Sequence, residues 1–223
     1  MITYFEFQSA FMNQEQKQLE ALQDIKDMMN RSSRFISLSG LSGIAAGLCA
    51  LAATIYIWPA WLSFTNKIPA ESNGMMPNYT YANLHVNLLV TGIITFVAAL
   101  LLAFLFTWLR SKKTNTSLMG SSAKRLMINT AIPLLAGGFV ILRLLQFELF
   151  GLIAPACLIF YGLALLNGSK YTVSEIRWLG ICEIILGLIN LWFIGYGLIA
   201  WAIGFGILHI LYGAMMWWKY ERV

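Results

Sequence analysis

The chain has few charged residues: Lys, Arg, Asp and Glu make up 11 % of its 223 residues, against 59 % hydrophobic ones. A soluble domain carries roughly 25 % charged residues, so this balance excludes an ordinary water-soluble protein. Apolar runs of ~20 residues, long enough to cross a bilayer as a helix, recur along most of the sequence. These runs are continuous rather than alternating, which excludes a transmembrane barrel. The composition predicts an all-α polytopic membrane protein surrounded by the lipid bilayer.

Aspartate is almost missing. The two aspartates, Asp24 and Asp27, precede the first apolar run, so the spans cannot build an aspartate-rich site for metal-diphosphate chemistry. The sequence also contains neither a G-x-S-x-G nucleophile elbow nor a G-x-x-x-x-G-K-(S/T) phosphate loop. We therefore expect no catalytic residues.

Cysteine and histidine are scarce as well. Cys49, Cys157 and Cys182 lie inside apolar runs without the short paired spacing of a disulfide framework or a thiolate metal site. Two histidines, His85 and His209, are too few for a multi-histidine iron or zinc centre without carboxylate ligands. We expect neither a metal nor a cofactor, and we interpret His85 as a histidine at the membrane–water interface.

Six apolar segments predict six transmembrane helices, which short connections arrange as three helical hairpins. The predicted spans are residues 35–58, 84–109, 126–145, 149–166, 176–194 and 197–218. Only Arg143, Gln146 and Glu148 separate the third span from the fourth, and the pair Arg143 and Glu148 is explained by snorkelling or mutual pairing at a tight outer turn. Residues 35–223 therefore form one transmembrane bundle.

Residues 1–34 are polar and lack the apolar core of a signal peptide, so we expect them to remain in the protein as a cytoplasmic lead-in. Within them, residues 14–31 place Leu19, Leu22, Ile25 and Met29 at three- and four-residue steps. This spacing predicts an amphipathic helix. A partner-binding or self-associating role for the helix is the alternative interpretation, so a protein partner or a homo-oligomer stays open.

The distribution of positive charge predicts the orientation. Of the 15 Lys and Arg residues, all but Lys67 and Arg143 fall on one side of the predicted membrane. The positive-inside rule places that side, with both termini, in the cytoplasm of a bacterial inner membrane. The basic loop 110–125 would attract anionic lipid headgroups, and we expect no nucleic-acid binding from the net charge of +5.

Two connections are predicted to be irregular. The outer loop 59–83 contains Pro59, Pro69 and Pro77 and cannot be regular helix throughout, whereas the Ser/Thr/Lys-rich loop 110–125 has the composition of a flexible segment. The triplet 78–80 matches a glycosylation acceptor, a pattern that arises often by chance.

Glycine recurs at seven-residue spacing in the last two spans, where residues 180–187 and 206–213 both follow G-I-x-(E/H)-I-(I/L)-x-G. Such spacing keeps small residues on one helix face and lets backbones approach closely. The glycines predicted to pack helices together are Gly40, Gly43, Gly47, Gly180, Gly187, Gly206 and Gly213. Whether the hairpins are true duplications stays open.

Two polar residues occupy equivalent positions of this repeat, Glu183 in the fifth predicted span and His209 in the sixth. An ionised carboxylate at that depth costs on the order of 2–3 kcal/mol unless it is paired. The two residues lie at similar depth, so we expect them to face each other. They form either a proton relay or binding site, or a buried structural hydrogen bond.

The segments 32–40, 151–156, 160–165, 180–184, 204–213 and 219–222 resemble a family of uncharacterised bacterial six-span inner-membrane proteins. Some of its members carry a carotene-oxygenase label, which does not fit a chain with two histidines because carotenoid-cleaving enzymes hold iron with four. The glycine-patterned segments 180–187 and 206–213 are also similar to acid-resistance membrane proteins with short tandem repeats. Neither resemblance implies an activity.

We expect a structural, stress-related or regulatory membrane component. The alternative is a small-solute or proton transporter that uses Glu183 and His209, and a membrane enzyme ranks third. A transporter requires a water-accessible cavity that reaches Glu183, whereas a structural protein requires a dry bundle.

Overall fold

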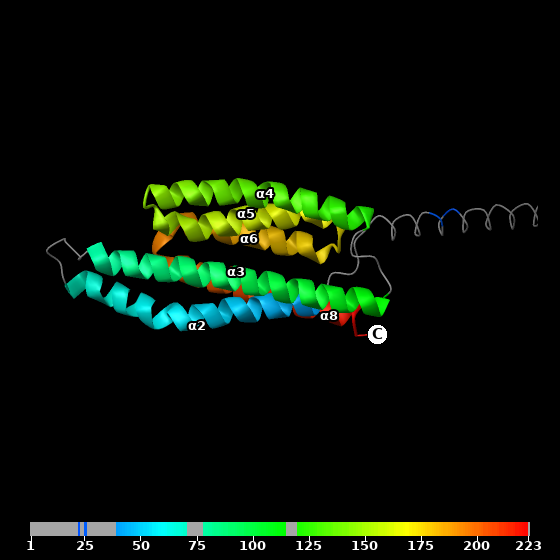
Figure 1. Cartoon of the computed structure of the whole chain (residues 1–223), viewed down its shortest axis with the longest axis horizontal. Coiled ribbons are helices and arrows are strands. Elements are labelled where there is room, and N and C mark those ends of the chain that lie inside the picture. Colours follow the sequence, from blue (N-terminus) through cyan, green and yellow to red (C-terminus); the bar gives the residue numbers. More distant parts are fainter. Residues whose placement is uncertain (1–21, 23–24, 26–38, 71–77, 115–119, 223) are drawn as a thin grey trace, which may run out of the picture.

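A computed structural model describes residues 22, 25, 39–70, 78–114 and 120–222, and within these ranges the chain is helical without a strand (Figure 1). The expectation of an all-α protein is confirmed for this part of the chain. The α-helices are α2 (Gly40–Ala70), α3 (Asn78–Thr114), α4 (Ser121–Gln146), α5 (Ile153–Gly168), α6 (Glu175–Trp192), α7 (Gly197–Trp201) and α8 (His209–Tyr220). The short elements are η1 (Phe150–Leu152), η2 (Ser169–Tyr171), η3 (Ile194–Tyr196) and the π-helix η4 (Ala202–Leu208), which joins α7 to α8.

Five helical segments are long and apolar enough to cross a membrane: Gly40–Leu62, Val86–Lys113, Ser121–Gln146, Phe150–Tyr171 and Ile194–Tyr220. They match five of the six predicted spans and support an integral membrane protein. The fifth predicted span corresponds to α6, which is not among them. Its 18 residues include three ionisable ones, Glu175, Arg177 and Glu183.

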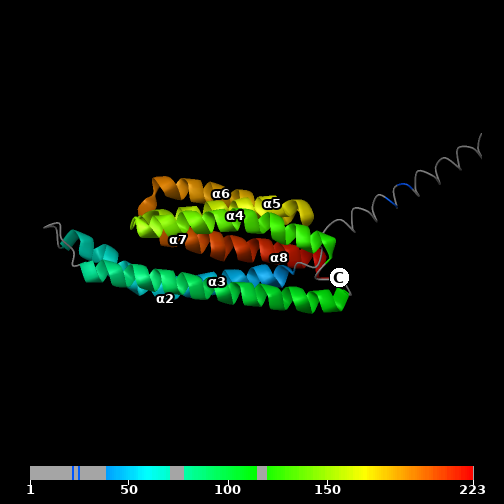
Figure 2. The ribbon, with the colours of Figure 1, turned by 45° about the horizontal axis from the view of Figure 1, so that its top comes forward.

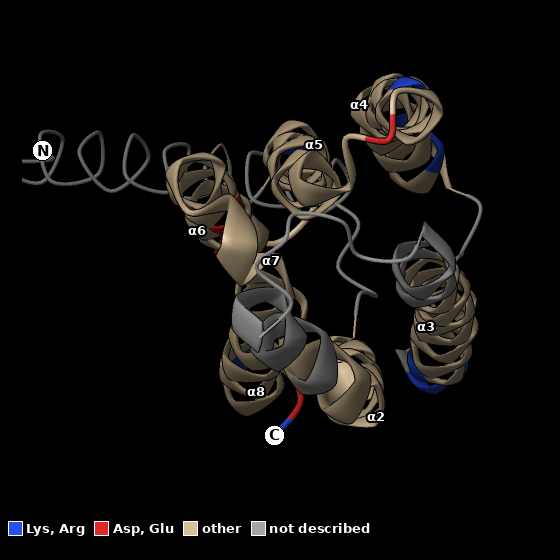
Figure 3. Ribbon diagram, turned by 90° about the vertical axis from the view of Figure 1, so that its left-hand side faces the viewer, with Lys and Arg blue, Asp and Glu red and all other residues tan. Residues whose placement is uncertain are grey.

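The helices form two groups with a shared rod between them. Helices α4, α5 and α6 lie side by side, α2 pairs with α3, and the continuous rod α7–η4–α8 runs between the two groups (Figures 1 and 2). The rod contacts α2 along much of its length and also contacts α5 and α6. Seen from one end, α3 stands at the margin of the bundle (Figure 3). The rod is therefore the element that joins the two groups.

The prediction of an irregular loop at 59–83 is wrong over most of its length. Helix α2 continues through Pro59 to Ala70, and α3 already begins at Asn78. An interior proline removes its own N–H from the helical ladder and its ring crowds the carbonyl four residues earlier, which can kink a helix without ending it. The backbone of α2 therefore stays helical past Pro59 while it packs along α3.

The connection 110–125 is also more helical than predicted, because α3 extends to Thr114 and α4 starts at Ser121. By contrast, the tight turn between the third and fourth predicted spans lies where the sequence placed it. Glu148 in this turn has a positive φ of 59°. The predicted amphipathic helix at 14–31 lies outside the described residues except for Leu22 and Ile25.

Glycines bring α2 against the rod. A Cβ atom built on Gly213 would lie 2.7 Å from both the Gly40 carbonyl oxygen and the Ile44 nitrogen, and one on Gly47 would lie 2.7 Å from the Gly206 carbonyl oxygen. A Cβ atom built on Gly43 would lie 3.1 Å from the Cα atom of Gly213. These contacts are to backbone, which cannot move aside as a side chain can. The two helices are therefore in backbone contact along this face.

A second glycine contact joins α5 and α6. A Cβ atom on Gly180 would lie 2.7 Å from the Gly162 carbonyl oxygen, and one on Gly162 would lie 2.6 Å from the Gly180 carbonyl oxygen. Farther along, a Cβ atom on Gly187 would meet Ile159 Cγ1 at 2.7 Å and the Pro155 carbonyl oxygen at 3.0 Å. Every glycine of the predicted packing set thus lies at a helix contact.

We predict that Gly187→Leu and Gly213→Leu each lower the melting temperature in detergent. The added side chain must push two helices apart, and overpacking of this kind costs about 1–3 kcal/mol. Gly138→Leu is the control, because a Cβ atom on Gly138 of α4 meets nothing within 4 Å. Thermal unfolding of the three variants measures the difference. Equal melting temperatures for all three would contradict the close packing.

Candidate functional site

The structure brings Glu183 of α6 and His209 of α8 together inside the bundle. Glu183 Oε1 lies 3.4 Å from His209 Nδ1. Glu183 is 0 % exposed and His209 is 6 % exposed. The pairing geometry expected from their repeat positions and similar depth is therefore present.

The hydrogen bonds of His209 fix the position of one proton. Its Nδ1 lies 2.9 Å from the Gly204 carbonyl oxygen, and its Nε2 lies 2.7 Å from the Tyr161 hydroxyl. A carbonyl oxygen only accepts, so Nδ1 must carry a hydrogen. In the neutral ring Nε2 then accepts a hydrogen bond from Tyr161. The imidazole is therefore held from both sides, by α5 and by η4.

Glu183 is close to a donor and yet lacks a hydrogen bond of its own. Neither of its carboxylate oxygens has a hydrogen-bond partner among the described residues. The Nδ1–H of His209 points to Gly204, so its 3.4 Å separation from Glu183 is an electrostatic contact only. A buried polar group without a partner costs about 1–3 kcal/mol, and more when it is charged. The contact with His209 is thus what offsets the cost of burying Glu183.

The π-helix makes room for this carboxylate. A Cβ atom on Gly204 would lie 2.6 Å from Glu183 Oε2 and 2.5 Å from Leu158 Cδ2, so any larger residue there would push these side chains aside. The Gly204 carbonyl, which lies within η4, also accepts the hydrogen bond from the His209 ring. Single π-turns inside helices often occur at functional sites. Glycine at 204 and the π-turn together shape the site.

Aromatic rings surround the histidine. The Phe205 ring lies 5.1 Å from the Tyr161 ring, 5.9 Å from the His209 ring and 4.5 Å from the Trp201 ring, between centroids. With Leu158, which is 0 % exposed, these half-buried rings pack around the buried pair. The candidate site consists of Tyr161, Glu183, Gly204, Phe205 and His209, and we call it the polar cluster. Sequence reasoning found its two ionisable members and missed the other three.

A pocket of about 290 Å³ lies elsewhere, between α2, α3 and the starts of α5 and α7. Its lining includes neither Glu183 nor His209.

Asn190, another buried polar residue of α6, donates from Nδ2 to the Phe193 carbonyl at 2.9 Å, while its Oδ1 has no hydrogen-bond partner among the described residues. The residues described include no group of three His, Cys, Asp or Glu side chains placed to hold a metal.

The other polar residues chosen from the sequence lie apart from this site. Arg143 donates to Gln146 Oε1 at 2.6 Å and stacks on the Phe147 ring at 4.7 Å, and no ion pair with Glu148 is present among the described residues. The predicted pairing of Arg143 with Glu148 is therefore not formed, and Arg143 contacts Gln146 and Phe147 instead. The His85 side chain lies outside the described residues.

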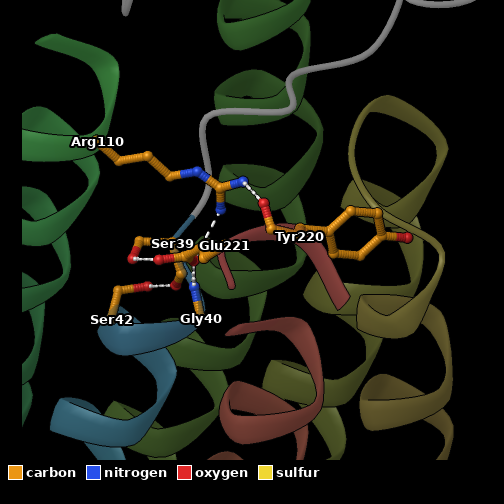
Figure 4. A network of polar contacts seen from close by, with 6 residues as sticks. All are labelled: Ser39, Gly40, Ser42, Arg110, Tyr220 and Glu221. Atoms are coloured by element: carbon orange, nitrogen blue, oxygen red, sulfur yellow. Dashed lines mark hydrogen bonds and ion pairs between the residues drawn. The ribbon is translucent and has the colours of Figure 1, made fainter. Parts of the chain in front are cut away.

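A polar network lies at the C-terminal end of the rod, and the sequence did not predict it (Figure 4). The Glu221 carboxylate accepts hydrogen bonds from Ser39 Oγ at 3.2 Å and from the Gly40 backbone N–H, at the start of α2. It also pairs with Arg110 of α3 at 2.8 Å. An anion at a helix N-terminus satisfies donors that the helix leaves open. Glu221 and Ser39 are 182 residues apart, so no local pattern signals this cap.

The preceding residues tie the same end of the rod to α6. Lys219 Nζ donates to Glu175 Oε1 at 2.6 Å, and the Tyr220 hydroxyl donates to Glu175 Oε2 at 3.0 Å. Residues 219–221 thus brace α2, α3 and α6 against the rod, and we call them the C-terminal brace.

Comparisons of this chain with protein-family models, with curated proteins and with solved structures find no match. The resemblances drawn from its sequence segments therefore stay predictions.

We predict that Glu183 and His209 are energetically coupled. Glu183→Gln and His209→Leu should each destabilise the bundle, and the double variant should lose less than the sum, with a coupling energy of about 1 kcal/mol. Unfolding in detergent measures all four proteins of the cycle. Additive losses would contradict the coupling.

We predict that Glu221→Gln lowers the stability by about 1–2 kcal/mol, because the amide retains one acceptor but loses the charge that faces Arg110 and the α2 N-terminus. Glu148→Gln makes the same chemical change at an exposed side chain and is the control. Melting temperatures at neutral pH provide the measurement. A similar loss in both variants would show that the brace contributes no specific stability.

Proposed function

We propose that this protein is a structural or regulatory component of a bacterial inner membrane, with six transmembrane helices and without catalytic activity. The observation that carries the proposal is the burial of Glu183 in the polar cluster. Glu183 is 0 % exposed, and so is the nearby Leu158. A carrier or channel needs its polar groups to be reached from water. Side-chain packing around Glu183 favours a dry bundle, and the pocket lies elsewhere.

The sixth span in this proposal is α6. It packs against α5 over much of its length and contacts α7, η4 and α8. Its carboxylate at position 183 faces His209 rather than lipid. A helix whose ionisable residue is turned toward the bundle interior can span a bilayer despite its composition.

The proposed orientation has both termini in the cytoplasm. The start of α2, the end of α3, the start of α4 and the end of α8 lie at the same end of the bundle (Figure 1). Arg110, Lys112, Lys124 and Lys219 belong to these helix ends. The positive-inside rule assigns this end to the cytoplasm, where basic side chains also attract anionic headgroups.

We predict that a chain without native cysteines is labelled from outside the cell at thiols placed within residues 71–77, and not at thiols placed within 115–119. A membrane-impermeant maleimide on intact cells and on permeabilised cells provides the comparison. Labelling of 115–119 in intact cells would reverse the orientation.

A proton transporter is the second candidate, and one observation favours it. The Glu183 carboxylate has no hydrogen-bond partner among the described residues and lies beside His209 and Tyr161, both of which can carry protons. Such a series of groups can pass a proton if water reaches either end. The two candidates therefore differ in whether Glu183 exchanges protons with the two sides of the membrane.

Proteoliposomes that hold a pH-sensitive dye separate the candidates. When a membrane potential is imposed, we expect wild type and Glu183→Gln to acidify no faster than protein-free vesicles. A rapid proton flux in the wild type that disappears in Glu183→Gln, with the melting temperature of that variant still measurable, would support the transporter instead.

A further inference from the structure

The 290 Å³ pocket has four walls that meet in one half of the bundle. Helix α2 contributes Thr54 and Ile57, α3 contributes Gly92 and Thr95, and the segments around η1 and η3 close the remaining sides. The pocket is partly open to the surroundings of the bundle, so a molecule can enter it. Small-molecule sites begin at about 300 Å³, so the pocket has the size of a ligand site.

The chemistry of the walls favours an apolar ligand. The lining side chains carry no charge. Two of the threonines use their hydroxyls within their own helices: Thr54 Oγ1 donates to the Ala50 carbonyl at 2.8 Å and Thr95 Oγ1 donates to the Thr91 carbonyl at 2.7 Å. The hydroxyls of Thr54 and Thr95 therefore offer no hydrogen to a guest. What remains is an apolar surface from Ala, Leu, Ile and Trp side chains.

The surroundings of α3 indicate the occupant. Helix α3 packs on α2, and its remaining surface exposes large apolar side chains, including Ile94 at 63 % and Leu101 at 65 %. In a membrane that surface is covered by lipid chains. The pocket lies along the same helix, between α3 and the starts of α5 and α7. Hydrocarbon therefore already lies next to the pocket.

We propose that the pocket holds an acyl chain of a membrane phospholipid, as a specific site separate from the general lipid layer. The chain fills the space that side chains leave between the α2–α3 pair and the rest of the bundle. Two glycines on opposite walls leave room for it: a Cβ atom on Gly92 or on Gly195 would meet nothing within 4 Å. The proposal depends only on the membrane location of these helices, so it stands whether or not Glu183 carries protons.

Photolabelling tests the proposal with the full chain in vesicles of phosphatidylethanolamine and phosphatidylglycerol. A trace of phospholipid with a diazirine on one acyl chain is irradiated, and mass spectrometry maps the adducts. Ile57 and Leu198 line the pocket and are only 4 % and 9 % exposed, so lipid on the outer surface of the bundle reaches little of either side chain. We expect adducts on both, beside surface adducts on Ile94.

Pocket-filling variants give the matched comparison. Gly92→Phe and Gly195→Phe should each lose the adducts on Ile57 and Leu198 while keeping those on Ile94. Gly138→Phe places the same ring in open space on α4, away from the pocket, and should keep all of them. Two filling variants on opposite walls guard against a folding defect in one.

Three outcomes would overturn the proposal. The first is labelling of Ile94 without labelling of Ile57 and Leu198 in the wild type. The second is persistence of these adducts in folded Gly92→Phe and Gly195→Phe proteins. The third is an organic extract of the purified protein that contains a stoichiometric apolar compound other than phospholipid, such as an isoprenoid quinone, whose amount falls in the filled variants.

Discussion

A carboxylate buried in an apolar bundle constrains everything around it. An ionised Glu183 without a partner destabilises the bundle. His209 lies 3.4 Å from its carboxylate, and Gly204 has no side chain that would collide with the carboxylate. His209 is in turn held by Tyr161 and by the Gly204 carbonyl. Three elements, α5, α6 and the rod, thus meet at this polar cluster.

Close packing elsewhere makes that contact possible. Gly162 against Gly180 fixes how near α5 comes to α6, and Gly213 against Gly40 fixes how near α2 comes to the rod. In a bilayer such contacts stabilise through dispersion, because lipid provides no hydrophobic drive between helices. The C-terminal brace adds charge-assisted contacts at one end, where Glu221 caps α2 and pairs with Arg110. The pocket lies away from these glycine contacts and from the C-terminal brace, and the side chains around it leave space unfilled.

Much of this arrangement follows from the sequence, because it depends on periodicity. Apolar runs predict the helices, and the spacing of the glycines predicts the faces that pack. The glycine face of α2 packs against the rod, and that of α6 packs against α5. The equal repeat positions of Glu183 and His209 placed them at matching depth. The π-turn at η4 and the role of Tyr161 leave no such pattern, since both depend on the rotation of neighbouring helices. Glu221 was missed for the same reason, and α2 exceeded its predicted end because Pro59 and Pro69 do not stop a helix that packs along α3.

The most direct test of the account is the protonation of the His209 ring. In a His85→Gln chain labelled with ¹⁵N-histidine, His209 is the only histidine, so its two ring nitrogens can be assigned by NMR. The account predicts a hydrogen on Nδ1, and a change in the Nε2 shift when Tyr161→Phe removes the hydroxyl. A neutral ring with its hydrogen on Nε2 could donate neither to Gly204 nor toward Glu183, and that result would contradict the account.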